Sequence, residues 1–192
     1  PGDEIIIADP IYSPTRLLTE DYLKEFNIKT NFYDPKNLST IKENFTDKTK
    51  LIYVENPGSN TFEFQDLGKI INFAKKNKVL TAIDNTWGTP YFLKPIKIGF
   101  DFSIVSATKY YSGHSDVMGG SLAVSKSVFK KVMRAQNMTG LRLSPDDAYF
   151  IMRGIRTLDV RLEKHQDNAN KLAKLYVKFC IFIELYIKTD LL

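Results

Sequence analysis

Short apolar runs rich in β-branched residues alternate with amphipathic stretches along most of the chain. The continuous runs over residues 4–9 and 51–56 are typical of strands buried on both faces. Apolar residues within 66–76 follow the i, i+3, i+4, i+7 spacing of an amphipathic helix. The remaining pattern predicts strands over 29–33, 79–84, 102–107 and 120–125, and helices over 15–26 and 38–45. Strands that alternate with helices indicate an α/β fold with a mostly parallel sheet.

The pattern changes after Ser144. Pro145 follows at the first helical position, with Asp146 and Asp147 in the first turn, which is typical of a helix start. From there to about residue 179 the chain predicts one or two long helices. We therefore expect three parts, which are an α/β domain over 1–143, a helical connector over 144–179 and an apolar tail over 180–192. Because PGDEIII runs directly into a strand and no further domain follows the connector, we expect a truncated chain that lacks an upstream segment and a C-terminal domain.

Composition and charge narrow the classes of function. The chain has 192 residues, 43% hydrophobic and 26% charged, as in an ordinary globular domain. Its formal charge of +5 comes from scattered lysines, so no nucleic-acid partner is expected, and no apolar run is long enough to span a membrane. The single cysteine, Cys180, favours a reducing compartment and a cytoplasmic protein. His114 and His165 have no cysteine near them, so no metal site is expected.

Polar residues stand at the carboxyl ends of several predicted strands, where ligands bind in open parallel sheets. We expect these residues to converge on one rim. A carboxylate, a lysine amine, hydroxyl groups for a phosphate and an aromatic ring to stack on a heterocycle together match the requirements of pyridoxal phosphate. The polar residues at these ends are Tyr12, Glu55, Ser59, Asp84, Ser106, Thr108 and Lys109.

Taken singly, none of these residues indicates a function. Asp84 precedes Asn85 in a turn-prone pair. Lys109 by itself is typical of a surface charge at a strand end, and Tyr12 by itself of an aromatic residue in a core or at its rim. The residues alone therefore leave a cofactor site and an ordinary sheet edge both open.

Four segments resemble, in order, the Cys/Met-metabolism family of pyridoxal-phosphate enzymes. This family includes cystathionine β-lyases, cystathionine γ-lyases, cystathionine γ-synthases and methionine γ-lyases. The resemblance runs from about residue 1 to about residue 175. It implies the aspartate-aminotransferase-like (type I) pyridoxal-phosphate fold, of which 1–143 would form the large, cofactor-binding domain only. The segments are ENPGSNTFE (55–63), AIDNTWGTPYFLKP (82–95), SATKYYSGHSDVMGG (106–120) and MRGIRTLDVRLEKH (152–165).

Carried onto this chain, the family pattern implies a role for each candidate residue. Lys109 would form the internal aldimine with pyridoxal phosphate and later move protons between substrate carbons. Asp84 would pair with the protonated pyridine nitrogen. Ser106 and Thr108 would hydrogen-bond the phosphate. Tyr12 would stack on the pyridine ring and take part in proton transfer.

Two further residues favour one branch of the family. Ser59 occupies a position where many members carry an asparagine near the phenolic oxygen of the cofactor, and the serine form resembles the β-lyase branch. Trp87 in DNTW occupies a position where synthases and γ-lyases usually carry phenylalanine. The implied reaction is α,β-elimination of a small amino-acid thioether, with cystathionine giving homocysteine, pyruvate and ammonia. A γ-lyase or γ-synthase is the alternative within the family. Arg153, Arg156 and Arg161 are interpreted as mainly structural.

The resemblance also implies parts that this sequence lacks. Members carry an upstream glycine turn for the phosphate, an upstream Tyr-x-Arg that reaches the neighbouring subunit of a homotetramer, and a C-terminal arginine for the substrate carboxylate. From about Val177 the sequence stops resembling the family. We expect little or no turnover by this chain alone. It would be either a segment of a working trans-sulfuration lyase of methionine biosynthesis or a non-catalytic remnant of a degraded gene.

Overall fold

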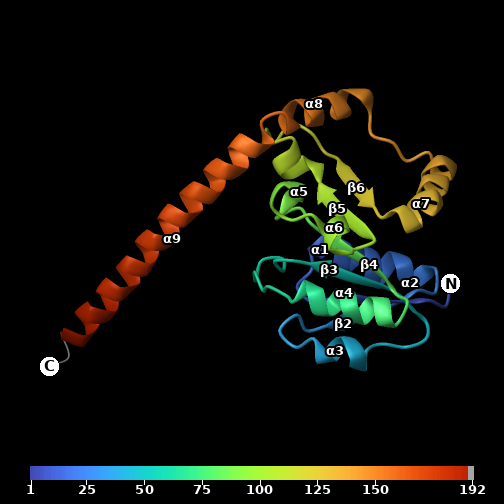
Figure 1. Ribbon diagram of the computed structural model, residues 1–192, viewed down its shortest axis with the longest axis horizontal. Coiled ribbons are helices and arrows are strands. Elements are labelled where there is room, and N and C mark those ends of the chain that lie inside the picture. Colours follow the sequence, from blue (N-terminus) through green and yellow to red (C-terminus); the bar gives the residue numbers. More distant parts are fainter. Residues whose placement is uncertain (190–192) are drawn as a thin grey trace.

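The computed structural model describes the backbone of residues 1–189, with side chains described through residue 178. Within these residues, six strands form one sheet in the order β2-β1-β3-β4-β5-β6 (Figure 1). All neighbouring pairs are parallel except β5 and β6, which are antiparallel. The mostly parallel α/β sheet that the sequence predicts is therefore confirmed. The strands are β1 (Glu4–Ala8), β2 (Lys29–Tyr33), β3 (Thr49–Glu55), β4 (Leu80–Asp84), β5 (Phe102–Ser106) and β6 (Gly120–Val124).

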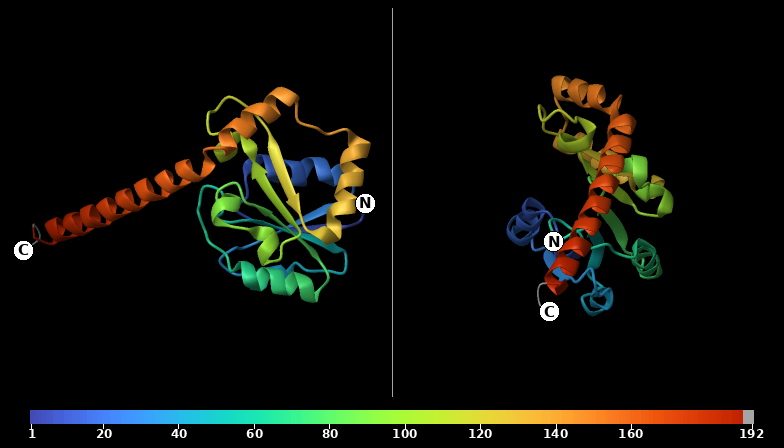
Figure 2. Two further views of the ribbon diagram at one scale, coloured as in Figure 1. Left: turned by 45° about the horizontal axis from the view of Figure 1, so that its top comes forward. Right: turned by 90° about the vertical axis from the view of Figure 1, so that its left-hand side faces the viewer.

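Helices cover both faces of this sheet. Figure 2 shows the helical stretch after β1 on one face and the helices after β2 and β3 on the other. The predicted helix over 15–26 forms as α1 and α2 joined by a π-helical turn, η1. The helices are α1 (Ser13–Leu17), η1 (Leu18–Tyr22), α2 (Leu23–Glu25), α3 (Ser39–Glu43), α4 (Leu67–Lys76), α5 (Thr89–Phe92), α6 (Pro95–Ile98), η2 (Ala107–Tyr111), α7 (Lys126–Thr139), α8 (Pro145–Ile155) and α9 (Leu158–Thr189).

The main core lies between the sheet and helices α3 and α4. The strand residues that contribute to it come from β1, β2, β3 and β4. The successive residues Ile6, Ile7 and Ala8 of β1 are all buried, so this strand is covered on both faces, as its continuous apolar pattern predicts. Asp66 is the N-cap of helix α4, and its side chain accepts the Lys69 N–H at 3.0 Å. The buried core residues are Ile6, Ala8, Tyr33, Ile41, Ile52, Val54, Ile70, Ile71, Ala74, Val79, Ile83 and Phe100.

The region after residue 125 contains one helix that the sequence pattern misses and two that it predicts. Helix α7 has apolar residues at helical spacing, such as Val128, Val132 and Ala135, although only Val128 is buried, and the sequence reading overlooked this pattern. Helix α8 begins as expected, with the Ser144 hydroxyl accepting the Asp147 N–H at 3.1 Å. Helix α9 projects away from the sheet (Figure 1) and continues through 179, the predicted end of the connector. The side chains of the predicted tail, 180–192, lie outside the described residues. The division into three parts stays a prediction.

Helix α9 is long, yet no helix of the described part of the chain combines the length and apolarity that crossing a membrane requires.

Helix α8 approaches the turn η2 so closely that only glycine fits at the contact. A Cβ atom on Gly154 would lie 2.1 Å from the Ser112 carbonyl oxygen and 2.3 Å from that of Tyr111. The Gly154 carbonyl in turn accepts a hydrogen bond from the Arg161 guanidinium at 2.8 Å. The backbone of η2, which carries Lys109, is therefore packed directly against α8 and the start of α9.

We expect Gly154→Ala to destabilise the chain by about 2 kcal/mol or more, because overpacking a tight backbone contact forces a displacement. Helix propensity alone predicts the opposite sign, a gain of up to about 1 kcal/mol. Gly68→Ala in α4 is the matched control, since its Cβ would meet only the Asp66 side chain at 3.4 Å. Urea unfolding followed by circular dichroism measures both variants. Equal free energies of unfolding for the two would contradict the contact argument.

Candidate active site

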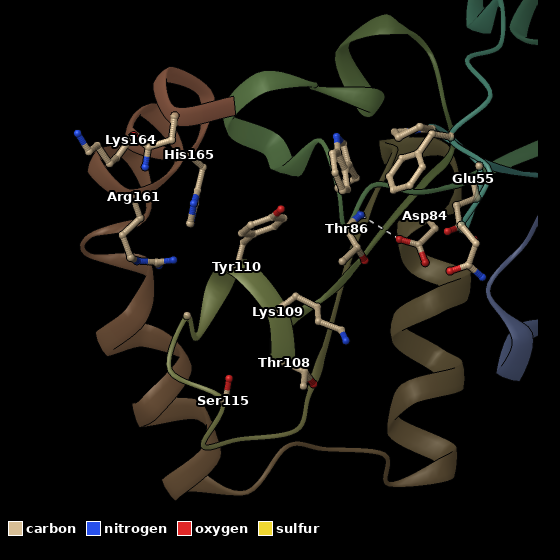
Figure 3. Close-up of a pocket in the computed structure, with 17 residues that line it drawn as sticks. Glu55, Asp84, Thr86, Thr108, Lys109, Tyr110, Ser115, Arg161, Lys164 and His165 are labelled. Carbon is tan, nitrogen blue, oxygen red and sulfur yellow. Dashed lines mark hydrogen bonds between the residues drawn. The ribbon is translucent and has the colours of Figure 1, made fainter. Parts of the chain in front are cut away.

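A cavity of about 710 Å³ opens at the carboxyl ends of β3, β4 and β5, within the size range of small-molecule sites (Figure 3). Acidic residues from the strand ends line one side, and basic residues from α9 line the other. Three aromatic rings complete the wall. Residues that line it with charged, hydroxyl or aromatic groups are Glu55, Phe62, Asp84, Thr86, Trp87, Thr108, Lys109, Tyr110, Ser115, Arg161, Lys164 and His165.

Asp84 ends β4 beside Glu55, which ends β3. The two residues are direct partners in the parallel ladder, so their side chains lie on the same face of the sheet. The Asp84 carboxylate accepts the Thr86 N–H at 2.9 Å, and the Thr86 hydroxyl accepts the Ser106 N–H at 2.8 Å. These bonds join the ends of β4 and β5 and leave the Asp84 side chain half-buried at the cavity wall.

Lys109 lies in η2, directly after β5. The backbone leaves helical geometry at this residue, with φ −91° and ψ −113°. Its neighbour Thr108 is held by the loop before β6, since its hydroxyl accepts the Gly119 N–H at 3.0 Å. The Lys109 side chain is exposed and points into the cavity (Figure 3). The turn therefore presents an amine to the space that Asp84 also borders.

The structure brings three of the six predicted cofactor residues to the cavity wall, namely Asp84, Thr108 and Lys109. Tyr12, Ser59 and Ser106 are not among the lining residues. Each of the three instead contacts a residue that lines the cavity.

Tyr12 donates its main-chain N–H to Glu55 Oε2 at 2.7 Å, while its side chain is 51% exposed. The Ser59 side chain lies close enough to the Glu55 carboxyl group to lower its pKa. Ser106 is half-buried and bonds the lining residue Thr86 through its main chain. Glu55 and Thr86 are therefore the links between the cavity and the three remaining predicted residues.

Sequence reasoning did not identify the basic wall on α9. Arg161, Lys164 and His165 lie at i, i+3 and i+4, so they share one helix face, and this spacing was the signal that could have found them. Arg161 donates to Gly154 O at 2.8 Å and to the Thr157 hydroxyl at 3.1 Å, which are contacts of a structural residue. Arg153 forms an ion pair with Asp116 at 2.9 Å, outside the cavity lining.

Aromatic rings form the remaining wall. Trp87 meets Phe62 edge-to-face with ring centroids 5.2 Å apart, and Tyr110 lies 5.8 Å from the ring of His165. These rings, a carboxylate, an amine and hydroxyl groups make up the set that a flat, phosphorylated heterocycle with a basic ring nitrogen requires. The described residues at this cavity therefore fit pyridoxal phosphate.

Among the residues that line the cavity, Glu55 has a strongly shifted pKa. The pKa of its carboxyl group is raised from 4.5 to about 7. Burial is the largest cause and the negative charge of Asp84 acts in the same direction, while the Tyr12 N–H and the Ser59 side chain partly oppose the shift. The pKa of Tyr53, on the same strand, is also raised by burial and by the charges of Asp84 and Glu55. The cavity wall therefore contains a carboxyl group that titrates near neutral pH.

The shifted pKa of Glu55 predicts a pH-dependent stability. The folded chain keeps this proton up to about pH 7, whereas the unfolded chain loses it near pH 4.5. The stabilisation by this proton is complete below pH 4.5 and is lost as pH rises through 7. The full shift corresponds to about 3 kcal/mol, and solvent screening of this partly exposed group reduces the expected change to about 1 kcal/mol.

Glu55→Gln removes this titration while it keeps an acceptor oxygen. We expect the free energy of unfolding of the variant to exceed that of the wild type by a margin that grows from pH 5 to pH 8. Chemical unfolding at several pH values checks this. A constant difference between the two proteins across that range would show that Glu55 does not titrate with a raised pKa.

Comparison with known proteins places the chain in a family. The model of the family described as "Cys/Met metabolism PLP-dependent enzyme" matches residues 1–178. A cystathionine β-lyase from Lactococcus lactis subsp. cremoris is 40% identical over 174 residues, which are 90% of this chain and 46% of the relative. A cystathionine γ-lyase from Bacillus subtilis is 38% identical over 173 residues, with the same two coverages. The chain spans about half the length of these relatives.

Solved structures agree with this match. Cystathionine γ-lyase from Lactobacillus plantarum, in complex with L-serine, superposes with a TM-score of 0.87 at 33% identity over 90% of this chain and 46% of that one. A Campylobacter jejuni protein that contains an N'-pyridoxyl-lysine-5'-monophosphate gives a TM-score of 0.84 at 28% identity, over 90% of this chain and 51% of that one. The type I fold expected from the resemblance is thus confirmed for the part present. The chain belongs to the Cys/Met-metabolism family of pyridoxal-phosphate-dependent enzymes.

Proposed function

We propose that this chain is part of a carbon–sulfur lyase that carries out α,β-elimination on cystathionine, giving homocysteine, pyruvate and ammonia. The observation that carries the proposal is the joint presence of Lys109 and Asp84 on one cavity wall at the carboxyl end of the sheet. Membership of the family supplies the cofactor to which these two groups are suited. A cytoplasmic homotetramer with shared active sites, inferred from the resemblance, stays a prediction.

Bound pyridoxal phosphate supplies an electron sink for the negative charge that develops at the α-carbon of the substrate. Lys109 presents its amine to the cavity, where it would hold the cofactor until the substrate amine displaces it, and the freed amine would then accept the α-proton. Asp84 keeps a proton on the pyridine nitrogen, because its half-buried carboxylate favours a neighbouring positive charge. Thr108, whose hydroxyl already lines the cavity, donates to the phosphate, and Ser106 is proposed to do the same.

The remaining predicted residues act on the cofactor ring and on the choice of bond that is broken. Tyr12 is proposed to stack on the ring and to assist proton transfer, and Ser59 to lie near its phenolic oxygen. Trp87 and Ser59 favour β-elimination, because their residue types resemble the β-lyase branch. The γ-lyase alternative is supported by the Bacillus subtilis relative, whose identity of 38% nearly equals that of the Lactococcus β-lyase.

The products of cystathionine cleavage distinguish the two reactions. Residues 1–178 can replace the matching segment of the Lactococcus lactis relative, which gives a chain of full family length. We expect this chimera to release pyruvate, since cleavage at Cβ leaves a three-carbon product. Release of 2-oxobutyrate as the main oxo acid would instead support γ-elimination. Coupled dehydrogenase assays specific for each product make the measurement.

Lys109 is expected to be the residue that binds the cofactor covalently. Pyridoxal phosphate added to the 192-residue chain should give an absorbance band near the visible edge, which Lys109→Ala abolishes. Lys164→Ala is the matched control, because Lys164 lines the same cavity. Borohydride reduction and peptide mass spectrometry should place the adduct on Lys109. An adduct on Lys164, or a band that survives Lys109→Ala, would refute this assignment.

Asp84 should matter strongly for rate. In the chimera, Asp84→Ala is expected to slow oxo-acid release on the order of a hundredfold or more, the scale of a single electrostatic group in an active site. Asp84→Asn keeps the shape of the side chain and should be impaired to a similar extent, because the charge is what is lost. Turnover near that of the unaltered chimera in either variant would exclude the proposed role.

A further inference from the structure

Two loops at the carboxyl edge of the sheet meet at Glu55. The first follows β1 and contains Pro10 and Tyr12, and the second follows β3 and contains Ser59. Glu55 accepts the main-chain N–H of Tyr12 at 2.7 Å, and the Ser59 side chain lies close enough to lower the pKa of the Glu55 carboxyl group. The Ser59 N–H closes the arrangement by donating to Pro10 O at 2.8 Å. One carboxyl group and one backbone bond thus join the two loops.

The two loops leave little room for relative movement. A Cβ atom on Gly58 would lie 3.0 Å from Pro10 Cγ and 3.1 Å from Glu63 Oε2. Gly58 also donates its N–H to Glu63 O at 2.9 Å, which fixes the second loop from its far side. The place of Tyr12 therefore depends on the strand end to which Glu55 anchors it.

The charged and titratable groups around Glu55 come from several elements. Asp84 on β4 is its ladder partner, Tyr53 stands two residues earlier on β3, and Lys109 on η2 lines the same cavity. Arg16 on α1, the nearest cation after Tyr12 in sequence, is engaged by Asp9 and Glu20. Glu55 thus shares its surroundings with an acid of the cofactor site and with the lysine proposed to hold the cofactor.

We propose that Glu55 is a positioning residue: its carboxyl group ties the main chain of Tyr12 to the strand end beside Asp84, and so fixes where the ring of Tyr12 stands at the edge of the cavity. This inference rests on the proposed function, because it is in that function that Tyr12 stacks on the cofactor ring. The contact itself is independent of that function and can be tested without the cofactor.

Ionisation of Glu55 should strengthen its hold on Tyr12. A carboxylate accepts a hydrogen bond more strongly than a neutral carboxyl group does. Because the pKa of Glu55 is raised to about 7 by burial and by Asp84, the Tyr12 N–H should be held more tightly as pH rises through neutrality. The amide of Tyr12 is therefore a direct reporter of the Glu55 proton.

The first experiment follows this amide by NMR in the ¹⁵N-labelled 192-residue chain without cofactor. The Tyr12 amide proton should move downfield with a midpoint near pH 7. Glu55→Gln should abolish the transition, and Asp84→Asn should keep it but lower its midpoint, because a negative charge is removed. The Asp9 amide, which bonds Tyr33 O instead, is the internal control. A Tyr12 amide that does not titrate, or titrates unchanged in Glu55→Gln, overturns the proposal.

Hydrogen exchange separates loss of the contact from general damage. Glu55→Ala should speed exchange of the Tyr12 amide at least tenfold, whereas Glu55→Gln should largely preserve its protection because the amide oxygen still accepts. Protection of the Asp9 amide should be the same in both variants. Equal exchange of Tyr12 in Glu55→Ala and the wild type overturns the proposed contact.

The second experiment adds pyridoxal phosphate and records its induced circular dichroism, which reports the asymmetric surroundings of the ring. Tyr12→Ala and Glu55→Ala should both reduce this signal, and Glu55→Gln should restore most of it. If Tyr12→Ala reduces the signal and Glu55→Ala does not, the positioning role is overturned. If neither variant changes it while the NMR transition is present, the stacking role within the proposed function fails and the Glu55 contact stands.

Discussion

The parallel register of β3, β4 and β5 is the constraint on which the site depends. It makes Glu55 and Asp84 ladder partners, which places two acids side by side where the strands end. Like charges at such positions disfavour double ionisation. The structure accommodates the two acids differently: the Asp84 carboxylate accepts the Thr86 N–H, while the pKa of Glu55 is raised to about 7, mainly by burial. The ladder register thus gives two chemically similar residues different surroundings, and the pKa of Glu55 is raised to near neutrality.

A second constraint comes from the far end of the chain. Helix α8 reaches η2 through Gly154, and the Arg161 guanidinium caps the same backbone from α9. The turn that carries Lys109 is therefore shaped by residues more than forty positions later in the sequence. The long helix has a double role, since it packs against η2 and also supplies the basic wall of the cavity.

The sequence predicts those parts of the molecule in which local pattern and tertiary environment agree. The sheet, α4 and the start of α8 were predicted because buried faces and caps leave clear signals in the sequence. Helix α7 was missed although its apolar residues recur at helical spacing, so its amphipathic pattern was a signal that could have predicted it. Asp84, Thr108 and Lys109 lie at one cavity wall, as expected for residues that follow the carboxyl ends of neighbouring strands in a parallel sheet. The attachment of Tyr12 through its main chain to Glu55, and the raised pKa of that residue, depend on burial and partners that no local pattern encodes.

Trp87 has a consequence of a different kind. It is the one tryptophan of the 192-residue chain, it lines the cavity, and its indole is 54% exposed and in edge contact with Phe62. All ultraviolet-excited indole emission of this molecule therefore originates at the site itself. Any ligand that enters the cavity and absorbs in the near ultraviolet can accept that energy, so occupancy is visible as quenching without a label. Trp87 emission therefore reports directly whether the cavity is occupied.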